Sequence, residues 1–165
     1  YSETVCAKYY GRGVVMHRGM DVTAGNLRIP HQYAASTTMV RNLATLMAGA
    51  QPTSLPLTIQ TGVTDVVSYT FSRPGDDRVV SLWRDGVAAE AAPGVTATLR
   101  LEGLSADSKV VAVDPLHGFQ QELKSAVQAG SLVITDLVVG VLLRILHLFV
   151  PAYVYLPIVE RESAP

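Results

Sequence analysis

The sequence has few of the residues from which metal sites and nucleophilic catalytic sites are built. Cys6 is the only cysteine, which excludes an internal disulfide and a cysteine-based zinc site. His17, His31, His117 and His147 are dispersed without ligand spacing, so we expect them to be surface or structural side chains. The chain also lacks a Walker loop, a G-x-S-x-G motif and a dinucleotide-binding fingerprint. We therefore predict no metal, no cofactor and no catalytic residue within it.

Charged residues are scarce as well, at 16% of the 165 residues, and the net charge is −1. Lys and Arg form no basic stripe, so nucleic acid is not an expected partner. Residues 1–4 do not have the character of a signal peptide. The chain does not begin with Met, and we expect it to be cut from a longer protein. Hydrophobic residues make up 48% of the chain, which is sufficient for a folded core.

The first third of the chain has the apolar period of helices. Residues 4–20 present one face formed by Val5, Tyr9, Gly13, Met16 and Met20. Three glycines weaken this helix, and we expect it to need a larger body to pack against. Residues 27–29 form a candidate short strand before the next helix.

A second and clearer helix is predicted over residues 37–50. Ser36 or Thr37 is the expected N-cap, and Gly49 with Pro52 ends the helix. Arg41 and Asn42 are expected in solvent. The apolar face consists of Met39, Leu43, Leu46, Met47 and Ala50.

After residue 52 the apolar period changes to two, which is typical of antiparallel strands with one buried face. Turn residues separate the expected strands, which cover residues 57–60, 66–72, 95–101, 109–114, 118–124 and 132–138. A further strand is expected in the middle of the run 77–86, which has a charged start and ends in an Asp-Gly turn. The corner at Asp114–Gly118 should be tight, because Pro115 restricts one φ and Gly118 frees another. The predicted fold is therefore mainly β: an antiparallel β-sandwich preceded by two helices. We divide the chain into a helical segment (1–52), the sandwich (53–140), and apolar final strands with a polar tail (141–165).

The apolar run at residues 137–159 allows two interpretations. Its length suits a membrane helix. Arg144, His147 and Pro151 oppose insertion, and the repeated Val and Leu fit one or two buried final strands. We favour strands, and a membrane-tethered domain remains the alternative.

Aromatic residues near the centre of the strand series are the candidate ligand-binding groups. Trp83, the only tryptophan, together with Tyr69 and Phe71 would make a sugar-stacking platform if their rings were exposed. Tyr69 and Phe71 lie on the same side of the expected strand as Val67, which indicates that they occupy core positions. Around Trp83, apolar residues occur at both odd and even positions, so alternation does not show which side of the strand is buried. Trp83 is the one predicted substrate-binding residue. A carbohydrate-binding module is accordingly a second functional hypothesis.

Several segments resemble the C-terminal part of bacterial glycoside hydrolase-like proteins. The similar segments are Ala7–Arg12, Arg41–Ala50, Val67–Ser72, Val80–Gly86 and Asp114–Leu123. Together they span about residues 5–139. After Val139 the chain departs from the closing strand of that family, because Gly140 is followed by Val141 and further apolar residues.

The resemblance implies a fold and a role. In that family a retaining (β/α)8 barrel precedes a small β-sandwich, so the two helices here would be the last helices of the barrel. The catalytic carboxylates of that family lie on earlier barrel strands, and no residue of this chain matches them. The resemblance thus implies a non-catalytic accessory domain whose partner is the catalytic barrel of the same parent chain. Its location would be secreted or cell-surface if the parent is a glycoside hydrolase, and no oligomeric state is implied.

Overall fold

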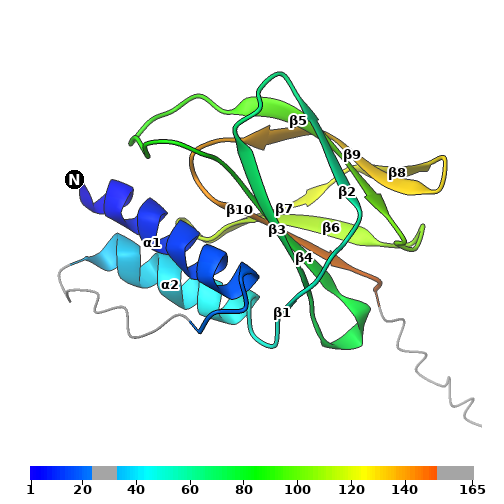
Figure 1. Cartoon of the computed structure of the whole chain (residues 1–165), viewed down its shortest axis with the longest axis horizontal. Coiled ribbons are helices and arrows are strands. Elements are labelled where there is room, and N and C mark those ends of the chain that lie inside the picture. The colour runs from blue at the N-terminus through cyan, green and yellow to red at the C-terminus, as the bar shows by residue number, and fades with distance from the viewer. Residues whose placement is uncertain (24–32, 152–165) are drawn as a thin grey trace, which may run out of the picture.

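The computed structural model describes residues 1–23 and 33–151 (Figure 1). Helices α1 (Glu3–Gly19) and α2 (Ala34–Leu46) come first. The strands are β1 (Gln51–Pro52), β2 (Leu57–Thr61), β3 (Val66–Ser72), β4 (Arg78–Arg84), β5 (Val95–Glu102), β6 (Lys109–Asp114), β7 (Phe119–Leu123), β8 (Ser125–Gln128), β9 (Ser131–Val139) and β10 (Arg144–Phe149), with a 3-10 turn at Pro74–Asp76. The strand predicted at residues 27–29 lies outside the described part of the chain.

The strands form two antiparallel sheets, which confirms the predicted fold class. A six-stranded sheet has the order β1-β3-β4-β10-β6-β7, and a four-stranded sheet has the order β2-β5-β9-β8. Every strand pair is antiparallel. Because the shared face of each sheet is apolar, the two sheets pack face to face as a β-sandwich.

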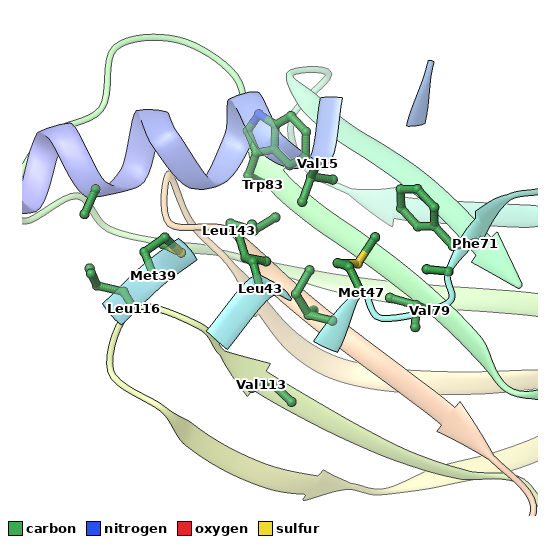
Figure 2. Packing of buried hydrophobic residues seen from close by; sticks show 13 residues of the cluster. Val15, Met39, Leu43, Met47, Phe71, Val79, Trp83, Val113, Leu116 and Leu143 are labelled. Atoms are coloured by element: carbon green, nitrogen blue, oxygen red, sulfur yellow. The ribbon is translucent and has the colours of Figure 1, made fainter. Parts of the chain in front are cut away.

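The two helices add a third layer on the outer face of the six-stranded sheet (Figure 1). Figure 2 shows the core between this helix layer and the sheet. The helices contribute Ala7, Val15, Met39, Leu43 and Met47, and the strands contribute Phe71, Val79, Trp83, Val113 and Ile145. The helices and the sandwich therefore share one buried core.

A separate core fills the space between the two sheets. It includes Val80, Leu82, Leu99, Leu101, Val110, Ile134, Leu137 and Leu146. Strand β4 contributes to both cores: Val79 and Trp83 face the helices, whereas Val80 and Leu82 face the four-stranded sheet. This double burial explains why β4 has apolar residues at both parities, as strands covered on both faces do.

The chain end predicted as final strands adopts that structure as far as residue 149. Residues 137–139 belong to β9, and β10 lies between β4 and β6 in the six-stranded sheet. Within residues 1–23 and 33–151, no helix has the length and apolar character needed to cross a membrane. The short strands β1 and β8 were not predicted.

The first helix packs against the rest of the molecule through a different side from the predicted one. Tyr9, Met16 and Met20 are 39%, 39% and 52% exposed, and of the predicted face only Val5 is buried. The helix instead packs through its small residues, including Ala7 and Gly11, and through Val15. Small residues face the core because α2 approaches closely: a Cβ at Gly11 would lie 2.9 Å from Met39 Sδ.

The second helix agrees with its prediction in its buried face but not in its bounds, since it ends at Leu46 rather than residue 50. Met39, Leu43 and Ala50 are fully buried, and Met47 nearly so. The N-cap is Tyr33 rather than Ser36 or Thr37, because the helix begins three residues earlier than expected. Asn42, predicted in solvent, donates from Nδ2 to the carbonyl oxygen of Pro115 at 2.8 Å.

Candidate functional site

Trp83 lies inside the core between the helices and the six-stranded sheet (Figure 2). It is 2% exposed, and its ring stacks on Tyr69 with centroids 5.7 Å apart and an interplanar angle of 21°. The exposed ring that the sugar-stacking hypothesis requires at Trp83 is therefore missing. Tyr69 and Phe71 pack in or against the same core, as their parity indicated.

A hollow of about 640 Å³ opens instead between β6–β7 of the large sheet and β9 of the small sheet. We call it the β7–β9 groove. Its walls are Ala112, Asp114, Phe119, Gln120, Gln121, Leu123, Asp136, Leu137, Val138 and Arg144. The volume falls within the range of about 300–1,000 Å³ that is usual for small-ligand sites.

The groove opens where Asp114, Ala112 and Gln121 replace large apolar side chains on the face of β6 and β7 that is directed at the other sheet. Register places Phe119 opposite Asp114 and Gln121 opposite Ala112, so these side chains share one face of the sheet. One further row along, Leu123 lies opposite Val110, which belongs to the inter-sheet core. The sandwich is thus closed by apolar residues at one end of these strands and open at the polar end.

Asp114 is held rigidly at the corner between β6 and β7. Its Oδ1 accepts hydrogen bonds from the backbone N–H groups of Leu116 (3.0 Å) and His117 (3.1 Å). Its Oδ2 lies 3.0 Å from His117 Nδ1 and 2.9 Å from Arg144 Nη1. The corner has the predicted backbone, with Gly118 at φ 75° and its N–H donating to the Asp114 carbonyl.

Phe119 is the exposed aromatic residue of the groove. It is 73% exposed, and its ring lies almost parallel to His117, with centroids 6.0 Å apart and an interplanar angle of 22°. His117 is fixed in turn by Asp114. The two rings therefore form a supported, flat surface at the mouth of the groove.

Asp136 reaches the opposite wall through a β-bulge. The pairing of β5 with β9 shifts between Ala97 and Leu99, and Asp136 has φ 58°. Aspartate tolerates this left-handed conformation better than most residues. The bulge keeps both Ile134 and Leu137 in the core while Asp136 lines the groove.

A smaller hollow of about 250 Å³ adjoins the groove and shares Val138 and Arg144 with it. Its other walls include Thr4 and Lys8 of α1 and His117. The Lys8 ammonium group donates to the carbonyl oxygens of Ala89 and Glu90. Burial, followed by the charge of Arg12, lowers the pKa of Lys8.

Arg12 ties α1 to two loops of the sandwich. Its Nη1 donates to the Gly86 carbonyl at 2.8 Å, and its Nη2 donates to the carbonyls of Arg84 (3.0 Å) and Val141 (2.5 Å). The side chain is buried, and this burial lowers the pKa of Arg12. These contacts are structural, because they use backbone acceptors and involve no reacting group.

Two other polar contacts lie away from the groove. His147 Nε2 lies 2.8 Å from Asp77 Oδ2, which links β10 to the residue before β4. Arg84 binds both carboxylate oxygens of Asp65 and thereby lowers the pKa of Asp65. Within the described ranges, no three His, Cys, Asp or Glu side chains are placed to hold a metal ion.

Sequence reasoning missed the groove residues for a physical reason. Phe119 and Gln121 share parity with Leu123, which predicts a buried face, yet only Leu123 lies beneath the other sheet. The signal available was the weak alternation of β7, in which polar residues occur at both parities. No local pattern indicated that Asp136 would line the groove, because a bulge depends on the pairing of two strands that are distant in sequence.

Comparison of the chain with protein-family models finds no match, and comparison with curated proteins finds none either. The similarity to glycoside hydrolase-like proteins is supported in its coarser part alone: two N-terminal helices precede two antiparallel sheets.

Proposed function

We propose that this chain is a non-catalytic C-terminal part of a glycoside hydrolase-like protein, in which the sandwich stabilises the catalytic barrel through α1 and α2. One observation carries the proposal: α1 has its charged residues on the inside and an uncharged face on the outside. A surface helix normally has the opposite arrangement.

The inward side of α1 carries all four of its Asp, Glu, Lys and Arg residues. Glu3 accepts a hydrogen bond from the Ala35 N–H, and Arg18 donates from Nε to the Ala50 carbonyl at 3.1 Å. Lys8 and Arg12 bind loop carbonyls of the sandwich, as described above. These bonds fix α1 to α2 and to the sandwich in one orientation.

The outward side of α1 carries no Asp, Glu, Lys or Arg. It consists of Cys6, Tyr9, Tyr10, Gly13, Met16, His17 and Met20, spaced by one to four residues along the helix. Met16 and Met20 are exposed, and the space beside Gly13 is open, whereas Tyr9 is partly exposed and its hydroxyl accepts a hydrogen bond from the Ala88 N–H. An exposed apolar face of this kind marks a contact surface. An apolar layer of strands and helices, as the wall of a barrel provides, suits this uncharged face.

Inspection of the coding sequence upstream of Tyr1 is the first test. The proposal expects a (β/α)8 barrel with two carboxylates at strand ends, about 5–5.5 Å apart in a retaining enzyme. In that parent protein, Met16→Lys should lower the Tm, because the new charge would be buried against the barrel. Gln60→Lys, on the exposed face of β2, is the matched control and should leave the Tm unchanged.

Activity measurements on the 165-residue chain complete the test. Aryl glycosides should not be hydrolysed by the chain alone, whereas the parent protein should hydrolyse them. Turnover by the chain that survives repurification would contradict the proposal. So would an upstream sequence without a barrel, or equal effects of Met16→Lys and Gln60→Lys on the parent.

A further inference from the structure

We propose that the β7–β9 groove binds a neutral oligosaccharide. This inference goes beyond the stabilising role proposed above, and it uses residues on the side of the sandwich formed by β6, β7 and β9. The groove combines an exposed aromatic ring with hydrogen-bonding side chains of both kinds. Sugars require both, because each ring has apolar C–H faces and a rim of hydroxyl groups.

The aromatic part is the Phe119 ring. At 73% exposure it leaves most of its surface to solvent, and its near-parallel contact with His117 limits its motion. The position of this exposed ring at the mouth of a concave surface makes it accessible to a ligand seated in the groove. A flat sugar ring fits such a surface, because its C–H groups contact the negative face of the aromatic system.

The polar part lies on both walls. Gln121 supplies an amide that donates and accepts, and Asp136 supplies a carboxylate that accepts from two adjacent hydroxyl groups. Arg144, with its side chain 33% exposed, supplies N–H donors beyond the one directed at Asp114. Ala112 is the small residue between these groups, and its size leaves the floor open.

The corner of the groove at Asp114 is preorganised rather than formed on binding. Asp114 is fixed by four contacts, and it fixes His117 and Arg144 in turn. The strand sets the backbone position of Gln121, and the bulge sets that of Asp136. Fixed side chains lose little conformational entropy when a ligand binds, which favours affinity for a weakly hydrophobic ligand such as a sugar.

The charges in the groove favour a neutral ligand over an ionic one. Asp114 neutralises Arg144 at 2.9 Å, and Asp136 adds a negative charge on the facing wall. An anionic sugar would meet Asp136, and a cation would meet Arg144 and lack a cluster of oxygen ligands. The lining thus carries two carboxylates and one guanidinium, a net charge of −1, which repels anions and leaves a cation a single carboxylate without an arginine beside it.

Calorimetric titration of the 165-residue chain with short neutral oligomers of glucose, xylose and mannose tests the proposal. At least one oligomer should bind saturably. Phe119→Ala should weaken that binding by about tenfold or more, because the stacking contact is lost. Val127→Ala, on the exposed edge strand β8 and outside the groove, is the matched control and should bind as the unaltered chain does.

Two further measurements separate the competing outcomes. Gln121→Ala should also weaken binding, and the Trp83 fluorescence of both variants should match that of the unaltered chain if folding is intact. Absence of binding to every neutral oligomer would overturn the proposal, as would binding unaffected by Phe119→Ala and Gln121→Ala. Preferential binding of uronic acid oligomers, or of an extended peptide along β7, would also overturn it. None of these outcomes depends on an upstream barrel, so the stabilising role stands or fails separately.

Discussion

Arg12 shows how a single residue joins the two parts of this molecule. Its guanidinium group reaches from α1 to three backbone carbonyls that are distant from it in sequence, at the end of β4 and in the two loops that hold Gly86 and Val141. A lysine would supply a point charge, whereas the planar fork of arginine reaches several acceptors at once. Burial of this cation is unfavourable on its own, and the three acceptors offset that cost.

We expect Arg12→Met to lower the free energy of unfolding by about 2–4 kcal/mol, because three backbone carbonyls lose a charged donor that links α1 to the sandwich. Urea unfolding followed by circular dichroism measures the change. Arg41→Met, on the exposed side of α2, is the control and should change stability by less than about 0.5 kcal/mol. Equal effects of the two substitutions would show that the loop contacts of Arg12 contribute nothing to stability.

At the scale of elements, β10 is covered on both of its faces, unlike a strand that has one face in solvent. It lies between β4 and β6 in the six-stranded sheet, and its neighbouring residues Ile145 and Leu146 are both fully buried. Ile145 packs under the helices, whereas Leu146 packs against the four-stranded sheet. An apolar run here therefore reflects coverage of both faces of the sheet, and a membrane anchor through residues 137–159 would require β10 to leave both cores.

We expect Ile145→Ala and Leu146→Ala each to destabilise the fold by about 2–5 kcal/mol, because each leaves a cavity in a packed core. Strand β5 supplies the comparison: Leu99→Ala should cost a similar amount, but its exposed neighbour Thr96→Ala should cost less than about 1 kcal/mol. Thermal unfolding of the four variants measures these differences. A small loss of stability in Ile145→Ala would contradict the conclusion that the helices cover β10.

At the scale of the whole molecule, the helices and the sandwich share a core, although the change in apolar period near residue 52 suggested a boundary there. Strand β1 begins at Gln51 and pairs with β3, and α1 contacts both of these strands. Trp83 lies in the shared core and is the only tryptophan. Its fluorescence therefore reports directly on the interface between helices and sheet.

We expect the helices and the sandwich to unfold in one transition, because neither can keep the shared core buried without the other. Trp83 fluorescence and far-ultraviolet circular dichroism should give the same urea midpoint. A fluorescence change at lower urea than the loss of strand signal would show that the helix layer detaches first, and would contradict a common unit.

Residue patterns predicted the elements with clean periods and failed where pairing decides the outcome. Strands β3 and β6 were predicted to the residue, because alternation or bounding turn residues define them locally. Strand β8 was missed, since Ser125–Gln128 is short and largely polar and depends on β9 for its hydrogen bonds. The buried side of α1 was mistaken, because its larger apolar residues face outward and its small residues face the core.

The sequence by itself determined the two helices, the antiparallel strands and the tight corner at Asp114–Gly118, because local backbone preference and apolar period are properties of adjacent residues. Only the tertiary structure decided that Trp83 is buried and that Phe119 is exposed. The reason is that exposure depends on which element covers a face: helices cover one side of β4, and no strand covers the polar end of β7 among the described residues. The same packing brings Asp114, Asp136 and Arg144 from three strands to one groove.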